Sequence, residues 1–266
     1  MSGHALKVGC PSEALLPGLV PYRENRELAS ELKFQVPISL AERICEWARF
    51  RLSPDPNAGA GDREDDYHLS SLYFDTEQLD VFRRNGSFAR SKYRIRRYGS
   101  SPTAFLERKL KTRGLVCKRR SPVRVDELKR LVAAEPASDW IGFWYHQRLL
   151  LRRLEPICQI AYHRTARIGA NGHGPIRLTV DQGIRAQPAQ GMSFADPAGG
   201  QLVSDGYAIV ELKYRREMPV LFKELVEQFA LNPKRISKYR VALVGLGLAS
   251  EPVGEEDGQK TTTDGH

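Results

Sequence analysis

The sequence predicts an α+β fold in which about eight antiparallel strands close into a β-barrel around a basic tunnel, with amphipathic helices flanking it. Three features indicate this fold. Many short segments alternate between apolar and polar residues, as strands do when their two faces have different surroundings. Arg and Lys dominate the polar face of these segments. Other segments have helical periodicity and carry apolar stripes, which need apolar strand surface to cover.

The composition is that of a folded domain with a basic surface. The chain has 266 residues, of which 41% are hydrophobic and 27% charged, and this excludes collagen-like and disordered classes. No apolar run approaches the roughly 20 residues that span a bilayer, and no signal-peptide pattern is found, so we expect a cytoplasmic protein without direct membrane insertion. The four cysteines are too far apart for a zinc knuckle or a redox pair. The formal net charge of +9 favours anionic partners.

One folded domain is predicted over residues 25–248. Residues 1–24 contain Gly and Pro and show no periodic pattern, and residues 249–266 are polar and rich in Gly. Both segments are typical of flexible tails.

Alternation of apolar and polar residues predicts the strands. In the first of them, Leu32, Phe34 and Val36 share one face, while Glu31 and Lys33 share the other. The later strands repeat this design. In chain order, strands are predicted over residues 27–36, 68–75, 88–98, 103–111, 115–120, 157–168, 176–181 and 207–215.

Helical spacing and capping residues predict the helices between these strands. Ser39 and Glu42 have the spacing of a capping box, Ser138 and Ser237 are N-cap candidates, and Pro219 is a favourable first helical residue. In chain order, helices are predicted over residues 40–52, 78–84, 125–134, 139–153, 219–231 and 238–248.

Basic residues collect on one face of the predicted strands, whereas a merely solvated run of charges would scatter over both. Because the helices need the apolar faces, the charged faces should line the barrel interior, where unit charges ~4 Å apart repel by about 4 kcal/mol at intermediate dielectric. A polyanion would relieve this repulsion, and phosphate oligomers suit it because Arg binds phosphate through paired hydrogen bonds. The interior basic residues are expected to be Lys33, Arg90, Lys92, Arg94, Arg96, Lys109, Lys111, Lys118, Arg120, Arg164, Arg177, Lys213 and Arg215.

Four acidic residues share this face, namely Glu31, Glu107, Asp181 and Glu211. Each of them can serve as an internal ion-pair partner. Carboxylates beside phosphate are also the usual setting for Mg²⁺ or Mn²⁺, so we expect at least one of the four to bind a metal.

Nine short motifs carry a resemblance to a known family. In this order they resemble the catalytic domain of the vacuolar transporter chaperone (VTC) polyphosphate polymerases, within the triphosphate tunnel metalloenzyme superfamily. The resemblance covers nearly all of residues 25–240. The motifs are ELKF (31–34), SLYFDT (71–76), KYRIRRY (92–98), LERK (106–109), CKRR (117–120), YHRTA (162–166), IRLTVD (176–181), VELKY (210–214) and ISKY (236–239).

The resemblance implies roles for individual residues. Glu211 matches the metal-binding glutamate of the family. The wider superfamily has a second acid where this chain has Ala29, so metal binding should depend more on Glu211. The residues that match the family's catalytic, phosphate-binding positions are Lys33, Arg94, Arg96, Lys109, Lys118, Arg164, Arg177 and Lys238.

The resemblance further implies an enzyme that transfers the terminal phosphoryl of ATP to a growing polyphosphate chain, with Mn²⁺ or Mg²⁺ as cofactor. ATP and inorganic polyphosphate would be its partners. The inositol-phosphate-sensing domain and membrane helices of the eukaryotic complexes have no counterpart in this sequence, which does not support a coupling of synthesis to transport. A membrane partner subunit cannot be read from the sequence.

Two other functions fit the same tunnel. One is a triphosphatase or nucleotide cyclase, in which water or the ribose hydroxyl is the nucleophile. The other is a sensor that binds polyphosphate or nucleotide without catalysis. RNA binding is disfavoured, because few aromatic residues are interleaved with the basic ones and a closed tunnel would exclude a duplex.

Overall fold

The computed structural model describes residues 29–56, 65–112 and 115–250. The predicted tail over residues 1–24 lies outside these residues, as does the predicted C-terminal tail from residue 251 onward. Within the described part, no helix is long and apolar enough to cross a membrane.

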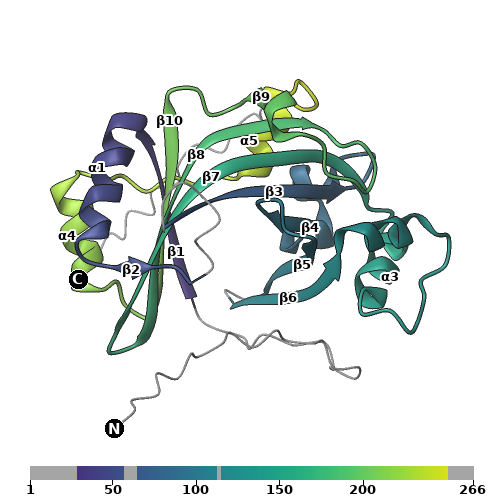
Figure 1. The fold of residues 1–266 in the computed structure, drawn as a ribbon, viewed down its shortest axis with the longest axis horizontal. Helices are drawn as coiled ribbons and strands as arrows, with labels where there is room; N and C mark the ends of the chain where they lie inside the picture. The colour runs from purple at the N-terminus through teal and green to yellow at the C-terminus, as the bar shows by residue number, and fades with distance from the viewer. Residues whose placement is uncertain (1–28, 57–64, 113–114, 251–266) are drawn as a thin grey trace, which may run out of the picture.

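One antiparallel sheet dominates the structure, and its eight long strands lie in the order β1-β10-β8-β7-β3-β4-β5-β6 (Figure 1). The two-residue strands β2 (Ser53–Pro54) and β9 (Gln201–Leu202) pair with β7 and β8. The fold class is therefore α+β, as predicted. The long strands are β1 (Ala29–Pro37), β3 (Asp66–Asp75), β4 (Ser91–Tyr98), β5 (Thr103–Thr112), β6 (Leu115–Arg124), β7 (Glu155–Asn171), β8 (Gly174–Pro188) and β10 (Tyr207–Arg215).

The sheet is strongly curved, as Figure 1 shows. Glu31 on β1 and Lys109 on β5 lie 3.3 Å apart, although five strands separate β1 from β5 in the hydrogen-bonded order. The two ends of the sheet thus approach each other through their side chains. Among the described residues no ladder joins β1 to β6, so the predicted closure into a barrel is not seen there.

Helices pack against apolar parts of the sheet in two groups. The helices α1 (Ile38–Arg49) and α4 (Val220–Gln228) pack on β1, β10 and β8, where Phe34, Leu178, Leu212 and Phe222 are fully buried. A second core includes α2 (Asp80–Arg83), α3 (Phe143–Leu151), α5 (Lys238–Gly245) and the 3₁₀ helix η2 (Val125–Val132). Two further 3₁₀ helices are η1 (Gly86–Arg90) and η3 (Pro197–Gly199).

Two predicted helix starts are wrong. Pro37 ends β1 and directly precedes α1, so Ser39 lies inside the helix rather than capping it. The helix α3 begins after Gly142 rather than after Ser138. Two backbone turns precede the helix, in which Trp140 N–H donates to the carbonyl of Ala137 and Phe143 N–H to that of Trp140. The Trp140 ring lies against Gly142, where a Cβ would lie 2.4 Å from it.

The strand β8 is longer than its alternation predicted. Gly183 adopts a φ of +57°, and the pairing with β7 shifts between Ala161 and His163. This β-bulge interrupts the alternation, and for that reason the predicted strand stopped at residue 181. The strand then continues to Pro188, with Ile184 and Ala186 in the second core.

Candidate anion-binding site

Charged side chains from seven strands and from α5 gather on the concave face of the sheet, where Tyr73 and Tyr162 of the second core lie among them. Most of the charged side chains are held in three groups, each of which is organised around one or two carboxylates. We call the whole set the charged face. Its basic members are Lys33, Lys92, Arg94, Arg96, Lys109, Lys118, Arg120, Arg164, Arg177, Lys213 and Lys238.

Glu107 on β5 organises the first group. Its Oε2 accepts a hydrogen bond of 2.6 Å from Nε of Arg94, and its Oε1 lies 3.5 Å from Lys118 and 3.4 Å from Arg120. Burial alone would raise the pKa of Glu107, but the surrounding cations outweigh it and hold the pKa well below its usual range. One ionised carboxylate on β5 therefore positions three cations from the two neighbouring strands, β4 and β6.

Asp181 on β8 organises the second group and is fully buried. Arg164 donates to it through Nε at 2.6 Å and through a terminal nitrogen at 2.8 Å, and the ammonium of Lys238 lies 2.5 Å from it. Burial would raise the pKa of Asp181, but Arg164 and Lys238 outweigh it and lower the pKa to about 2. Two cations thus share a single negative charge.

Glu31 and Glu211 form the third group, on the neighbouring strands β1 and β10. The ammonium of Lys33 lies 2.8 Å from Glu31 and 3.8 Å from Glu211, and that of Lys213 lies 2.6 Å from Glu211. Burial opposes ionisation of both carboxyls, but the lysines hold the pKa of each below its usual value. Both are therefore ionised at neutral pH.

Some cations of the charged face have neutral partners. Arg96 donates to the hydroxyl oxygens of Ser71 at 3.2 Å and Tyr162 at 2.9 Å. The ammonium of Lys92 donates to Ser237 at 3.2 Å. Lys92 reaches solvent but is enclosed by protein in most directions, and this burial, together with the charges of Lys33 and Lys109, lowers its pKa to about 8. Positive charge therefore exceeds negative charge on this face.

The structure brings together the residues that the resemblance singled out. Lys33, Arg94, Arg96, Lys109, Lys118, Arg164, Arg177, Lys238 and Glu211 all lie on the charged face. Arg177 also pairs with Asp55 at 2.7 Å, in the segment after β2. That partner was not expected from the sequence.

Three predicted interior cations are not among the basic members of the charged face named above. Arg215, the last residue of β10, extends beside Gly174 at the start of β8, where a Cβ would lie 3.3 Å from its side chain. Arg90 belongs to η1 rather than to β4, and it lines a cavity on the opposite side of the sheet. The 3₁₀ turn ends the alternation that had placed Arg90 with Lys92. The side chain of Lys111 lies outside the described residues.

One tyrosine of the charged face, Tyr73, was missed by sequence reasoning. Tyr73 on β3 accepts a hydrogen bond of 3.3 Å from Arg94. Burial alone would raise the pKa of Tyr73, but Arg94 and Arg96 outweigh it and lower the pKa to about 8. The signal was available, because Ser71 and Tyr73 alternate with apolar Leu72 and Phe74.

The third group also contains oxygen atoms of the kind that could hold a divalent cation. Thr179 lies directly opposite Glu211 in the β8–β10 register, is 1% exposed, and its Oγ1 has no hydrogen-bond partner within the described part of the chain. Mg²⁺ is commonly held by one or two carboxylates together with substrate phosphates and water. Glu211 and Glu31, with Thr179 beside them, fit this pattern. No group of three or more His, Cys, Asp or Glu that could hold a metal occurs in residues 29–56, 65–112 and 115–250.

Comparisons with known proteins agree with this architecture. The family model described as VTC domain matches residues 28–246. A candidate adenylate cyclase from Bacillus halodurans is similar in structure, with 16% sequence identity and a TM-score of 0.51 over 80% of this chain and 95% of that chain. At this identity the likeness concerns the fold alone.

A second solved structure is a candidate adenylyl cyclase from Hippeastrum, described as having a dominant triphosphatase activity. It is 14% identical, with a TM-score of 0.46 over 81% of this chain and 95% of that chain. No curated protein matches the chain in sequence.

Proposed function

The chain belongs to the VTC domain family, and on that basis we propose that it is a metal-dependent phosphotransferase that moves the terminal phosphoryl of ATP onto a growing polyphosphate chain. The proposed functional unit is residues 25–248. The donor, ATP, makes the cytoplasm the proposed place of action. In this proposal the curved sheet forms the wall of a tunnel through which the polyphosphate threads.

The observation that carries this proposal is the excess of cations along the charged face. They extend from Lys118 on β6 to Lys33 on β1, with Lys238 entering from α5, so the positive charge is a continuous surface rather than a single pocket. An extended polyanion matches such a surface, because each added phosphate brings further negative charge to it. A single nucleotide would leave much of this charge unmatched.

The reaction needs positioning and charge neutralisation more than proton transfer. The terminal oxygen of the polyphosphate chain attacks the γ-phosphorus of ATP, the bond from that phosphorus to the bridging β–γ oxygen breaks, and ADP leaves with the electron pair. Both nucleophile and leaving group are already ionised phosphates, so no protein base is required. Arg164, Lys238 and Arg94 would hold the phosphoryl oxygens in line.

Glu211 and Glu31 would hold the Mn²⁺ or Mg²⁺ ion. The bound ion would supply charge neutralisation on the phosphate oxygens. Lys33 and Lys213 would hold both carboxylates in place and keep them ionised.

A triphosphatase is the second candidate function, because the same face could bind a triphosphate and present it to water. The ion pairs argue against it. In the described structure each of the four carboxylates on the charged face is engaged by at least two cations, which makes it a weak base for activating water. This observation favours phosphate over water as the nucleophile.

The test is to incubate the pure protein with ATP and Mn²⁺ and to resolve the products by phosphorus NMR. Polymerase activity gives the signal of internal phosphoryl groups, which increases as ADP accumulates. Triphosphatase activity gives short products without internal phosphoryl groups. Binding of labelled polyphosphate without any turnover would identify a sensor and overturn the proposal.

A further inference from the structure

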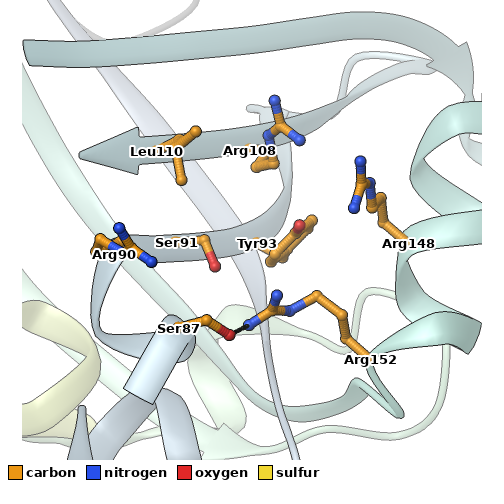
Figure 2. Close-up of a pocket in the computed structure, with 8 residues that line it drawn as sticks. All are labelled: Ser87, Arg90, Ser91, Tyr93, Arg108, Leu110, Arg148 and Arg152. Atoms are coloured by element: carbon orange, nitrogen blue, oxygen red, sulfur yellow. Dashed lines mark hydrogen bonds between the residues drawn. The ribbon is translucent and has the colours of Figure 1, made fainter. Parts of the chain in front are cut away.

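A second basic site lies on the convex side of the sheet, away from the charged face. It is a cavity of about 310 Å³ between β4, β5, η1 and α3 (Figure 2). Side chains on strands alternate, so the residues of β4 and β5 that line the cavity point away from Lys92, Arg94 and Lys109. The lining residues are Ser87, Arg90, Ser91, Tyr93, Arg108, Leu110, Arg148 and Arg152.

Four arginines line this cavity, and its lining contains no carboxylate. Figure 2 shows Arg148 and Arg152 extending from the end of α3 toward the two strands. These two side chains are four residues apart and so lie on one side of the helix. Arg108 comes from β5 and Arg90 from the end of η1. Four guanidinium groups thus surround one small volume without an acidic partner among its lining residues.

The cavity also contains polar atoms that lack partners. Ser91 is only 4% exposed, and its Oγ has no hydrogen-bond partner within the described part of the chain. The Nε atoms of Arg108 and Arg152 are likewise buried without partners among those residues. Buried donors of this kind are costly unless a ligand or water satisfies them. These unpartnered atoms indicate, independently of the positive charge, that the cavity holds a ligand with hydrogen-bond acceptors.

Part of the site is already rigid. A terminal nitrogen of Arg152 donates to Ser87 Oγ at 3.0 Å, and its guanidinium lies 4.1 Å from the centre of the Phe88 ring. An arginine held by stacking and by one hydrogen bond loses little freedom when it binds an anion. The site is therefore partly preorganised.

We propose that this cavity binds a compact oligophosphate of two or three phosphoryl groups, independently of the phosphotransferase function proposed above. A phosphate group carries about 1.5 to 2 negative charges at pH 7, so two or more are needed to match four guanidinium groups. The volume lies at the lower end of the roughly 300–1,000 Å³ typical of small-molecule sites, which suits a short oligomer rather than a long chain. Guanidinium groups are also the cations that bind phosphate oxygens in pairs.

The test is arginine modification by phenylglyoxal, with tripolyphosphate as the probe and the labelled residues identified by mass spectrometry. Arg148 is exposed and should react readily in the free protein. When tripolyphosphate exceeds its Kd by about four times, labelling of Arg148 should slow by about fivefold, because the unoccupied fraction falls as 1/(1 + [L]/Kd). Arg43, an exposed arginine on α1, is the matched control and should label at the same rate throughout.

A variant separates this site from the charged face. Arg148→Gln changes an exposed side chain, so folding should be kept, and calorimetry should show the loss of one tripolyphosphate-binding site per chain while phosphoryl transfer from ATP continues. Three results would overturn the proposal: unchanged labelling of Arg148, equal protection of Arg43, or an unchanged number of binding sites in the variant. Equal protection by inorganic phosphate at the same concentration would overturn the assignment to an oligophosphate. None of these readouts depends on catalysis.

Discussion

The ammonium group of Lys238 lies 2.5 Å from Oδ2 of Asp181 and joins the first residue of the last helix to a strand more than fifty positions earlier. Asp181 also accepts two hydrogen bonds from Arg164. Lys238 is thus the second cation on a carboxylate that already has one. It contributes positive charge beyond what Asp181 needs.

Replacing Lys238 by Ala should therefore impair function more than stability. We expect phosphoryl transfer to fall tenfold or more, on the order of 1.4 kcal/mol in the barrier. The melting temperature should change little, because Arg164 still neutralises Asp181. Initial rates and a thermal melt measure the two effects. Lys234→Ala, which removes an exposed lysine nearby, is the control. Lost stability with normal activity per folded molecule would make Lys238 a structural residue.

Replacing Glu211 by Gln should remove metal-dependent turnover and leave polyanion binding intact or stronger. The change deletes a hard oxygen ligand and leaves Lys33 and Lys213 without one of their carboxylates. Electron paramagnetic resonance should show weaker Mn²⁺ binding, a readout that does not depend on activity. Glu42→Gln, on the exposed side of α1, is the control of equal charge change. Full Mn²⁺ affinity in the Glu211 variant would contradict the metal role.

Anion binding should weaken as pH rises from 7 to 9. Lys92 and Tyr73 each have a pKa of about 8, so Lys92 loses a positive charge and Tyr73 gains a negative one over this range. An anion favours the charged lysine and the neutral tyrosine, so binding takes up protons. If the bound anion raises the pKa of Lys92 or Tyr73 by one unit, the anion binds the protonated form of that residue about tenfold more tightly than the deprotonated form.

Calorimetry of tripolyphosphate binding in two buffers of different ionisation enthalpy measures this proton uptake. The double variant Lys92→Arg/Tyr73→Phe keeps the positive charge and cannot ionise the ring, so its binding should depend much less on pH. Equal affinity of the natural protein at pH 7 and pH 9 would contradict the expectation.

Tripolyphosphate should raise the melting temperature by relieving repulsion on the charged face. A ligand that binds only the folded state stabilises it by RT ln(1 + [L]/Kd), which is about 2.7 kcal/mol at 100 times Kd. The Arg148→Gln variant, which lacks the proposed second site, should keep most of the shift. Sodium chloride at matched ionic strength is the control. An absent shift at millimolar tripolyphosphate would argue against an accessible basic surface.

The strands that carry the charged face were largely predictable from the sequence. The strand β10 has the predicted bounds, and Glu211 and Lys213 lie on the same face, as alternation required. Alternation succeeds here because one side of the strand meets an apolar core and the other meets charge. The charged face follows from the same pattern.

Other features depend on contacts that alternation does not encode. Arg90 was misplaced because a 3₁₀ turn interrupts the strand, and the end of β8 was missed because Gly183 forms a bulge. The pairing of Arg177 with Asp55 joins segments far apart in the chain. Periodicity reports local surroundings, whereas these positions are decided by backbone turns and long-range neighbours.

The pairing of β1 with β10 has a consequence for how the protein is made. Lys33 lies opposite Glu211 in that ladder, so strands near the two ends of the described chain form one group of the site. A ribosome must release residues up to β10 before Lys33 can meet Glu211, and α5 before Lys238 can reach Asp181. Pairing of segments so distant in sequence also slows folding, because the entropy cost of closing the long loop comes before the stabilising contacts form. The charged face is therefore incomplete for most of the chain's synthesis, and a ligand that needs the whole face can stabilise only the finished protein.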